Sequence, residues 1–198
     1  GWLEDHPSHT LPGFNERLME WLPSMIEHRC SIGERGGFFQ RLRTGTWMGH
    51  VLEHVTLELQ TLAGTPVGYG RARETKTRGV YHVIIEYREE GFAIACLHAA
   101  HALVTAAIEG QPFAVEPTVE TLREQLLTEQ LGPSTRSIVA AARRRDIPVR
   151  RLNEGSLVRL GIGEKQRRIL AAETDQTSAI AESIAQDKEL TRRLLAEA

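Results

Sequence analysis

Cysteine, aromatic residues and net charge are all scarce in this chain of 198 residues. Its two cysteines are too few for a disulfide scaffold and suit a reducing compartment, so we expect a cytoplasmic protein. A formal charge of −2 gives no overall electrostatic reason to expect nucleic acid or an anionic membrane as a partner. We identify no apolar run near the roughly 20 residues that a membrane span requires. The rest of the amino-acid composition is that of an ordinary globular protein, 41% hydrophobic and 25% charged. The length of the chain suits one or two domains.

The ends of the chain lack the signals with which many proteins begin and end. No initiator Met precedes Gly1, and the first residues have neither the basic nor the apolar region of a signal peptide. Residues 190–198 keep a helical pattern without Gly or Pro to stop it. We therefore expect a piece of a longer protein.

A helix, a β-hairpin and a further helix form the predicted centre of an α+β unit, with helices on one face of an antiparallel sheet. Residues 47–62 have the strongest helical pattern, with Thr46 as a plausible N-cap and Gly64 at the end. Residues 67–74 and 80–87 read as strands joined by a tight turn. The Gly- and Arg-rich stretch over residues 30–45 predicts a loop, which could include a short helix at residues 38–42. The other expected helices cover residues 14–22, 92–108 and 116–131.

A second, smaller α/β unit is predicted after residue 131, where the character of the sequence changes at Leu-Gly-Pro-Ser-Thr. We therefore divide the chain into domains at 1–131 and 132–198. Ser134 is the expected cap of its first helix, which runs to residue 145. The expected strands cover 147–152, 157–160 and 167–172, and helices follow at 177–185 and 187–198.

The pattern His50-Val-Leu-Glu53-His54 lies within the strongest predicted helix. At about 100° per residue these two histidines and the glutamate share one face. Two imidazoles one turn apart can bind one Zn²⁺, and a neighbouring glutamate can act as general base on a zinc-bound water. This is the H-x-x-E-H order of residues, so we predict zinc bound by His50 and His54 with Glu53 as the catalytic residue.

A third protein ligand is needed to complete such a site, and two candidates are available. Glu58 lies one further turn along the same helix, although that helix curves away from a point metal. His98 lies on the next helix, with His101 close by, and a facing helix gives better tetrahedral geometry. We therefore prefer His98 and expect the other histidines to be surface or structural residues, at positions 6, 9, 28 and 82.

A basic cluster surrounds the predicted hairpin. Arg71, Arg73 and Arg78 carry the charges that could hold an anionic ligand such as a carboxylate-rich polymer. The alternative is a solvated strand face, which is the usual role of such a cluster.

Several runs of residues, taken together and in order, are specific enough to indicate a family. In the first unit they are 27–31 (EHRCS), 45–54 (GTWMGHVLEH), 58–64 (ELQTLAG) and 67–75 (VGYGRARET). In the second they are 131–135 (LGPST), 174–180 (TDQTSAI) and 184–191 (IAQDKELT). With these runs the chain resembles the cyanophycin synthetase family, over its N-terminal domain and the opening of its ATP-grasp region.

The resemblance implies a parent enzyme that is an ATP-dependent ligase. Such a ligase builds a polyaspartate backbone and attaches arginine to each side chain, so aspartate, arginine and the cyanophycin polymer are the expected partners. ATP and Mg²⁺ are the implied cofactors of the parent, which is expected to be a homo-oligomer. The ATP-grasp pattern Asp-Lys-x-x-Thr places Lys188 near the nucleotide. This piece carries no Gly-rich P-loop or Mg²⁺-binding acidic set, so we do not expect it to ligate alone.

The resemblance also bears on the first domain, which in this family is similar to a metallopeptidase and can trim polymer into primers with a zinc site. His50, Glu53 and His54 match that motif, whereas many members are expected to carry an acidic residue at the position of His98. Two other functions stay open from the sequence: a stand-alone zinc-dependent peptidase, and a non-catalytic module for polymer binding or oligomerisation.

Overall fold

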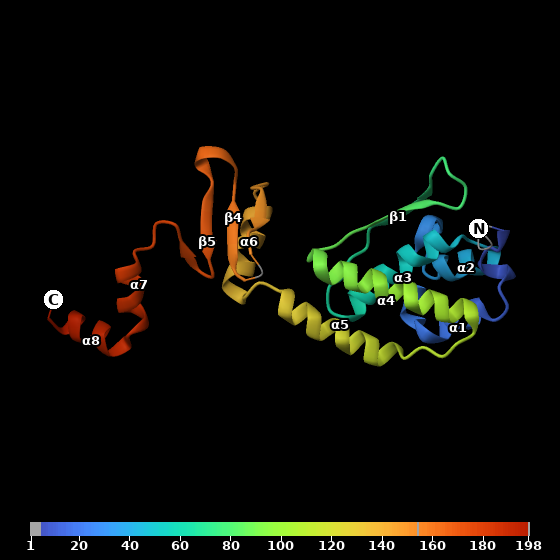
Figure 1. The fold of residues 1–198 in the computed structure, drawn as a ribbon, viewed down its shortest axis with the longest axis horizontal. Helices are drawn as coiled ribbons and strands as arrows, with labels where there is room; N and C mark the ends of the chain where they lie inside the picture. The colour runs from blue at the N-terminus through green and yellow to red at the C-terminus, as the bar shows by residue number, and fades with distance from the viewer. Residues whose placement is uncertain (1–4, 154, 198) are drawn as a thin grey trace. The chain divides into compact units, whose positions relative to one another are not determined.

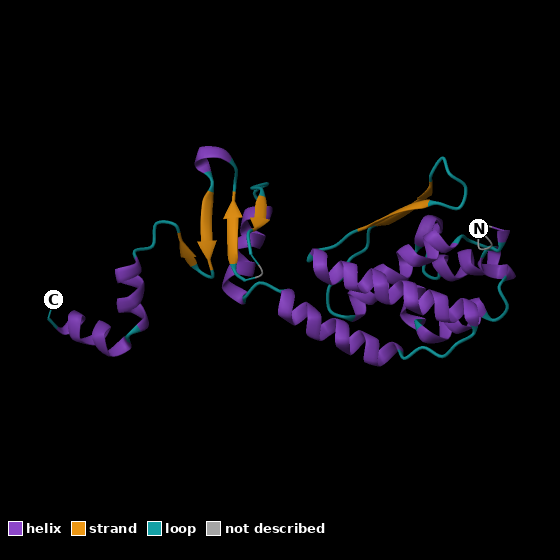
Figure 2. Cartoon of the chain, viewed as in Figure 1, coloured by secondary structure: helices purple, strands orange, loops and turns teal. Residues whose placement is uncertain are grey.

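The computed structural model describes residues 5–153 and 155–197, and the chain divides into two compact units between Glu129 and Gln130. The first unit is mostly helical with one hairpin, and the second is built on a small sheet (Figures 1 and 2). Helices and two antiparallel sheets together agree with the predicted α+β class.

The core of the first unit forms where α3 (Met48–Leu62) packs along α4 (Glu90–Glu109). Helix α5 (Val115–Glu129) packs on α4, and α1 (Phe14–Trp21) and α2 (Gly37–Thr44) complete the layer around them (Figure 1). Each large apolar side chain buried here contributes roughly 1.5–3 kcal/mol, which fixes α3 firmly in the unit. Fully buried members of this core include Phe14, Leu18, Phe38, Leu42, Val51, Val55, Leu59, Phe92 and Leu103.

The hairpin of β1 (Gly70–Glu74) and β2 (Tyr81–Ile85) lies along α3 (Figure 1). In its register Ala72 lies opposite Val83, and both are half-buried. The next pair along, Arg73 and His82, is exposed on the other side of the hairpin. A two-stranded hairpin is at best marginally stable by itself in water, so its contact with α3 is what holds it.

Helix α4 is long and apolar enough to cross a membrane by length and composition, which corrects the expectation that no apolar run is of that size. Within the unit, however, α4 is a core helix. Its residues Phe92, Cys96, Ala100 and Leu103 are fully buried between α3 and its other neighbours. Burial against helices accounts for these apolar residues.

The second unit packs α6 (Pro133–Arg143) against one face of a four-stranded antiparallel sheet. The strands follow one another in chain order as β3 (Val149–Arg151), β4 (Leu157–Leu160), β5 (Arg167–Leu170) and β6 (Glu173–Thr174). The short β6 was not predicted. Helices α7 (Ala179–Gln186) and α8 (Lys188–Ala196) follow the sheet. The small core consists of Leu131, Val139, Val158 and Ile169.

The other face of this sheet carries a row of arginines. Arg150 lies directly opposite Arg159, which lies directly opposite Arg168, so three neighbouring strands place like charges side by side. None of the ion pairs found among residues 5–153 and 155–197 involves this row. The Nε atom of Arg159 is buried and has no hydrogen-bond partner among the residues that the structure describes.

Two expected helix caps differ in the structure. Trp47, not Thr46, is the N-cap residue of α3, and the Thr46 hydroxyl instead bonds to the His50 ring. Gly132 precedes α6, with Pro133 in the first turn, where its missing N–H costs nothing; Ser134 lies inside the helix.

Candidate metal centre

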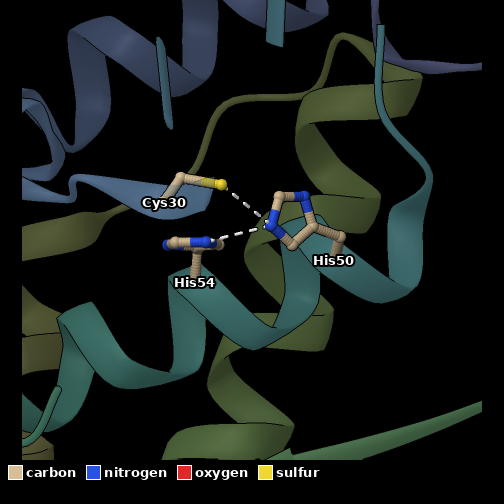
Figure 3. Close-up of side chains that lie close together, drawn as sticks. All are labelled: Cys30, His50 and His54. Atoms are coloured by element: carbon tan, nitrogen blue, oxygen red, sulfur yellow. Dashed lines mark hydrogen bonds between the residues drawn. The ribbon is translucent and has the colours of Figure 1, made fainter. Parts of the chain in front are cut away.

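His50 and His54 lie one turn apart on α3, and their rings converge with the side chain of Cys30 (Figure 3). The two Nε2 atoms are 3.1 Å apart, and Cys30 Sγ lies 3.4 Å from His50 Nε2. All three ligand atoms lie within 4.8 Å of one another. Ligands of a tetrahedral zinc ion lie roughly 3.3–3.6 Å apart for the usual Zn–N and Zn–S bond lengths. The two spacings, 3.1 and 3.4 Å, are close to this range, so the three side chains could hold one metal ion.

Cys30 reaches the histidines from a tightly folded segment that precedes α2. Its own backbone is in the left-handed region, with φ 52°. The segment turns back on itself, and Phe38 N–H donates to the His28 carbonyl at 3.0 Å. Gly37 permits this closeness, because a Cβ there would lie 2.0 Å from the Arg29 carbonyl oxygen. The fold of this backbone segment thus places the Cys30 thiol next to the histidines of α3.

Each histidine of the cluster has its second ring nitrogen held by another side chain. His50 Nδ1 bonds to Thr46 Oγ1 at 2.8 Å, and His54 Nδ1 bonds to His28 Nδ1 at 2.8 Å. His28 Nε2 in turn bonds to Glu58 Oε2 at 2.7 Å. Metal-binding histidines almost always have such a partner on the other nitrogen, which orients the ring.

The electrostatic environment keeps both rings neutral at neutral pH. Burial lowers the pKa of His54 to about 2, helped by the neighbouring His50 and His28. Burial also lowers the pKa of His50 to about 4, with a smaller effect from Arg41. A neutral imidazole is the form that binds a metal.

Glu53 lies on the same helix and faces the edge of β1. It is only 5% exposed, and this burial raises its pKa to about 7, against a smaller opposing effect of the Ala72 N–H that donates to it. Gly70 leaves room for the carboxylate, because a Cβ at that position would lie 2.6 Å from Glu53 Oε1. A carboxylate with a pKa near the working pH is suited to general-base catalysis.

These groups surround a pocket of about 800 Å³ between α3, the Cys30 segment and β1. Besides the three possible ligands and Glu53, the wall includes the charged residues Arg29, Glu27 and Arg71. The pocket therefore combines a possible metal centre with a base and with charges of both signs.

Comparison with known proteins identifies the family. Residues 1–109 match the model of the cyanophycin synthase-like N-terminal domain. The chain belongs to this family. Cyanophycin synthetase of Crocosphaera subtropica is 41% identical over 99% of this chain, and that of Trichormus variabilis is 43% identical over 98%. The cyanophycin synthetase of a Synechocystis species is 42% identical over 99% of the chain.

These cyanophycin synthetases are much longer than the present chain. The match covers 23%, 22% and 23% of their respective lengths, so the chain spans less than a quarter of each relative. The likeness extends through both compact units. The likeness to these relatives is therefore not confined to residues 1–109, which match the family model.

Some of the site residues predicted from the sequence lie together in the pocket, and others lie outside it. It brings His50, His54 and Glu53 to one pocket, with Arg71 on its wall. The preferred third ligand, His98, is neither in the cluster of possible ligands nor among the residues that line this pocket, and Cys30 takes its place. Glu58 is in the pocket wall but bonds to a histidine outside the cluster.

The remaining predicted residues lie elsewhere. Arg73 is on the exposed side of the hairpin, and Arg78 makes an ion pair with Asp5. Lys188 is the exposed first residue of α8 in the second unit, where the Asp187 side chain caps the helix by accepting from Leu190 N–H.

The sequence predicted no site role for Cys30, which entered only the judgement of redox compartment and the family resemblance, or for His28, which was expected to be a surface or structural residue. Both lie in the run EHRCS, outside any α-helix, so no α-helical period connects them to His50. The available signal was chemical: a thiol and an imidazole two residues apart in a Gly-rich loop are common metal-site residues.

Proposed function

We propose that the first unit binds zinc through Cys30, His50 and His54 and uses it to hydrolyse amide bonds of cyanophycin. The observation that supports this most is the convergence of two imidazole Nε2 atoms and a thiol, each histidine oriented from behind by a further hydrogen bond. One thiolate and two neutral imidazoles are a donor set that zinc prefers, with a fourth position left for water or substrate. The residues present therefore fit the metal.

The chemistry follows from where each group lies. Zinc, when bound, supplies Lewis acidity to the scissile carbonyl and makes a water molecule acidic. Glu53 takes the proton from the attacking water and returns it to the leaving amine nitrogen, which balances the hydrolysis. Arg71 and Arg29 can pair with carboxylates of the polymer, because these charged side chains line the same pocket.

The parent protein, in this proposal, is a ligase that polymerises aspartate and arginine with ATP and Mg²⁺. What supports it is the identity of more than 40% to proteins named cyanophycin synthetase across both units. The second unit would be the leading part of the ATP-grasp region, with Lys188 close to the nucleotide, and the first unit would hold polymer and cut it into primers.

Metal analysis combined with a cleavage assay tests the hydrolase proposal. The purified chain should contain about one zinc per molecule, and His50→Ala and Cys30→Ala should lose it. Glu53→Gln should keep the zinc and yet fail to cut multi-arginyl polyaspartate, as judged by the new amino termini released. A protein that folds but binds no zinc refutes the proposal and favours a non-catalytic polymer-binding module.

A separate assay addresses the ligase. The full-length parent should incorporate labelled aspartate and arginine into polymer only when ATP and Mg²⁺ are present, and Lys188→Ala should raise the concentration of ATP required. Failure of the parent to extend polymer would favour the alternative of a zinc-dependent peptidase.

A further inference from the structure

A line of hydrogen-bonded polar side chains runs from the candidate metal centre through His28 to Glu58. His54 Nδ1 bonds to His28 Nδ1 at 2.8 Å, and His28 Nε2 bonds to Glu58 Oε2 at 2.7 Å. Ser24 donates its hydroxyl to the other oxygen of Glu58. The side chains of His28 and Glu58 are only 17% and 4% exposed, so water offers them little alternative pairing.

Fold stability alone gives a weak account of this arrangement. A buried carboxylate–histidine pair loses its hydration, and such a pair is often no more stable than packed apolar side chains of the same volume. Glu58 is also outside the cluster of possible ligands, among the residues that the structure describes. Its carboxylate bonds to His28, and His28 bonds in turn to His54.

The two ligand histidines are supported differently. The Nδ1 atom of His50 bonds to a neutral hydroxyl, that of Thr46. The Nδ1 atom of His54 bonds instead to the His28 imidazole, which is itself bonded to the Glu58 carboxylate. A carboxylate hydrogen-bonded to the other side of a ligating imidazole fixes the position of the ring proton and makes the ring a stronger electron donor to the metal.

We propose that Glu58 and His28 are positioning residues that hold His54 in its metal-binding tautomer and strengthen it as a ligand. With a metal on Nε2, His54 carries its proton on Nδ1 and donates it to His28 Nδ1. His28 then carries its own proton on Nε2 and donates it to Glu58. Every hydrogen bond has one donor and one acceptor, and the negative charge of Glu58 supports the ligand across two bonds. This inference rests on the proposed zinc site.

Glu58→Gln tests the inference because it keeps the size of the side chain and removes only the charge. We expect the dissociation constant for zinc, measured by competition with a chelator, to rise about 10- to 100-fold. Glu27→Gln is the matched control: this carboxylate lines the same pocket but pairs with Arg35 at the surface, so the constant should change less than about twofold. The absorption spectrum of the cobalt-loaded protein should also change in Glu58→Gln and not in Glu27→Gln.

The outcomes separate the possible failures. If the wild-type chain binds no zinc, the proposed function fails and this inference with it. If the wild type binds zinc and Glu58→Gln binds it equally well with the same cobalt spectrum, the zinc site stands and the positioning role is wrong. A variant that is less stable without metal but binds zinc normally shows a structural role only, which also overturns the inference. Ser24→Ala, which removes the other partner of Glu58, gives a milder second variant should Glu58→Gln not fold, and it should weaken zinc binding in the same direction.

Discussion

Replacing Glu53 with glutamine should stabilise the metal-free first unit at pH 8 and leave it nearly unchanged below pH 5. Burial raises the pKa of Glu53 from 4.5 to about 7. A raised pKa means that the folded unit holds the proton more tightly than the unfolded chain does. The stability that goes with this proton is complete below pH 4.5 and is lost as the pH rises through 7. Glutamine stays neutral and avoids that loss.

The size of the effect follows from the same values. One pKa unit corresponds to about 1.4 kcal/mol, so a rise from 4.5 to about 7 limits the difference at pH 8 to about 3 kcal/mol. The glutamine oxygen can still accept the hydrogen bond that Ala72 N–H donates to Glu53. We therefore expect the variant to gain on the order of 1–3 kcal/mol at pH 8.

Urea unfolding in the presence of a chelator measures this difference. The three tryptophans of the chain all precede residue 48, so their fluorescence reports on the first unit. Glu86→Gln is the control: hydrogen bonds from the Gly68 and Tyr69 N–H groups lower the pKa of Glu86, so its loss should destabilise the unit alike at pH 5 and pH 8. The reasoning is refuted if Glu53→Gln has the same effect at both pH values.

Three further substitutions have expected outcomes. Gly70→Ala should slow polymer cleavage at least tenfold with zinc content unchanged, because the new Cβ would lie 2.6 Å from the Glu53 carboxylate; normal cleavage rates would contradict this. Gly37→Ala should destabilise the first unit by about 1–3 kcal/mol in thermal unfolding and weaken zinc binding, since a Cβ 2.0 Å from a backbone carbonyl displaces the Cys30 segment. Cys30→Ser should weaken zinc binding at least tenfold in chelator competition while His98→Gln leaves it unchanged, and the reverse result would restore the sequence-based choice of ligand.

The elements that position the site could be predicted where one period governs a long run. The helical pattern of residues 47–62 agrees closely with α3, and the alternation of residues 80–87 contains β2. Because His50, Glu53 and His54 lie on one regular helix, their common face follows from about 100° per residue. That part of the pocket required no knowledge of loop geometry.

The rest of the cluster could not be predicted, because it depends on how a loop closes. Cys30 lies 20 residues before His50, and a left-handed φ together with close packing at Gly37 decides where its thiol points. Neither is visible as a period in the sequence. Glu58 is on the predicted face of α3, but its partner His28 lies in the same loop, so the sequence suggested a metal ligand where the structure has a hydrogen-bond partner.

The arginine row of the second unit makes that unit sensitive to ionic strength. Directly opposed like charges on neighbouring strands repel each other, and the half-buried Arg159 receives repulsion from both sides. The unit from Gln130 onward has 13 Lys and Arg against 9 Asp and Glu, so its surplus of +4 adds to this repulsion. Dissolved salt shortens the range of such forces to about 10 Å at 0.1 M and to about 3 Å at 1 M, which is less than the spacing of neighbouring strands. We therefore expect molar salt to stabilise this unit by weakening a repulsion that the near-neutral charge of the whole chain conceals.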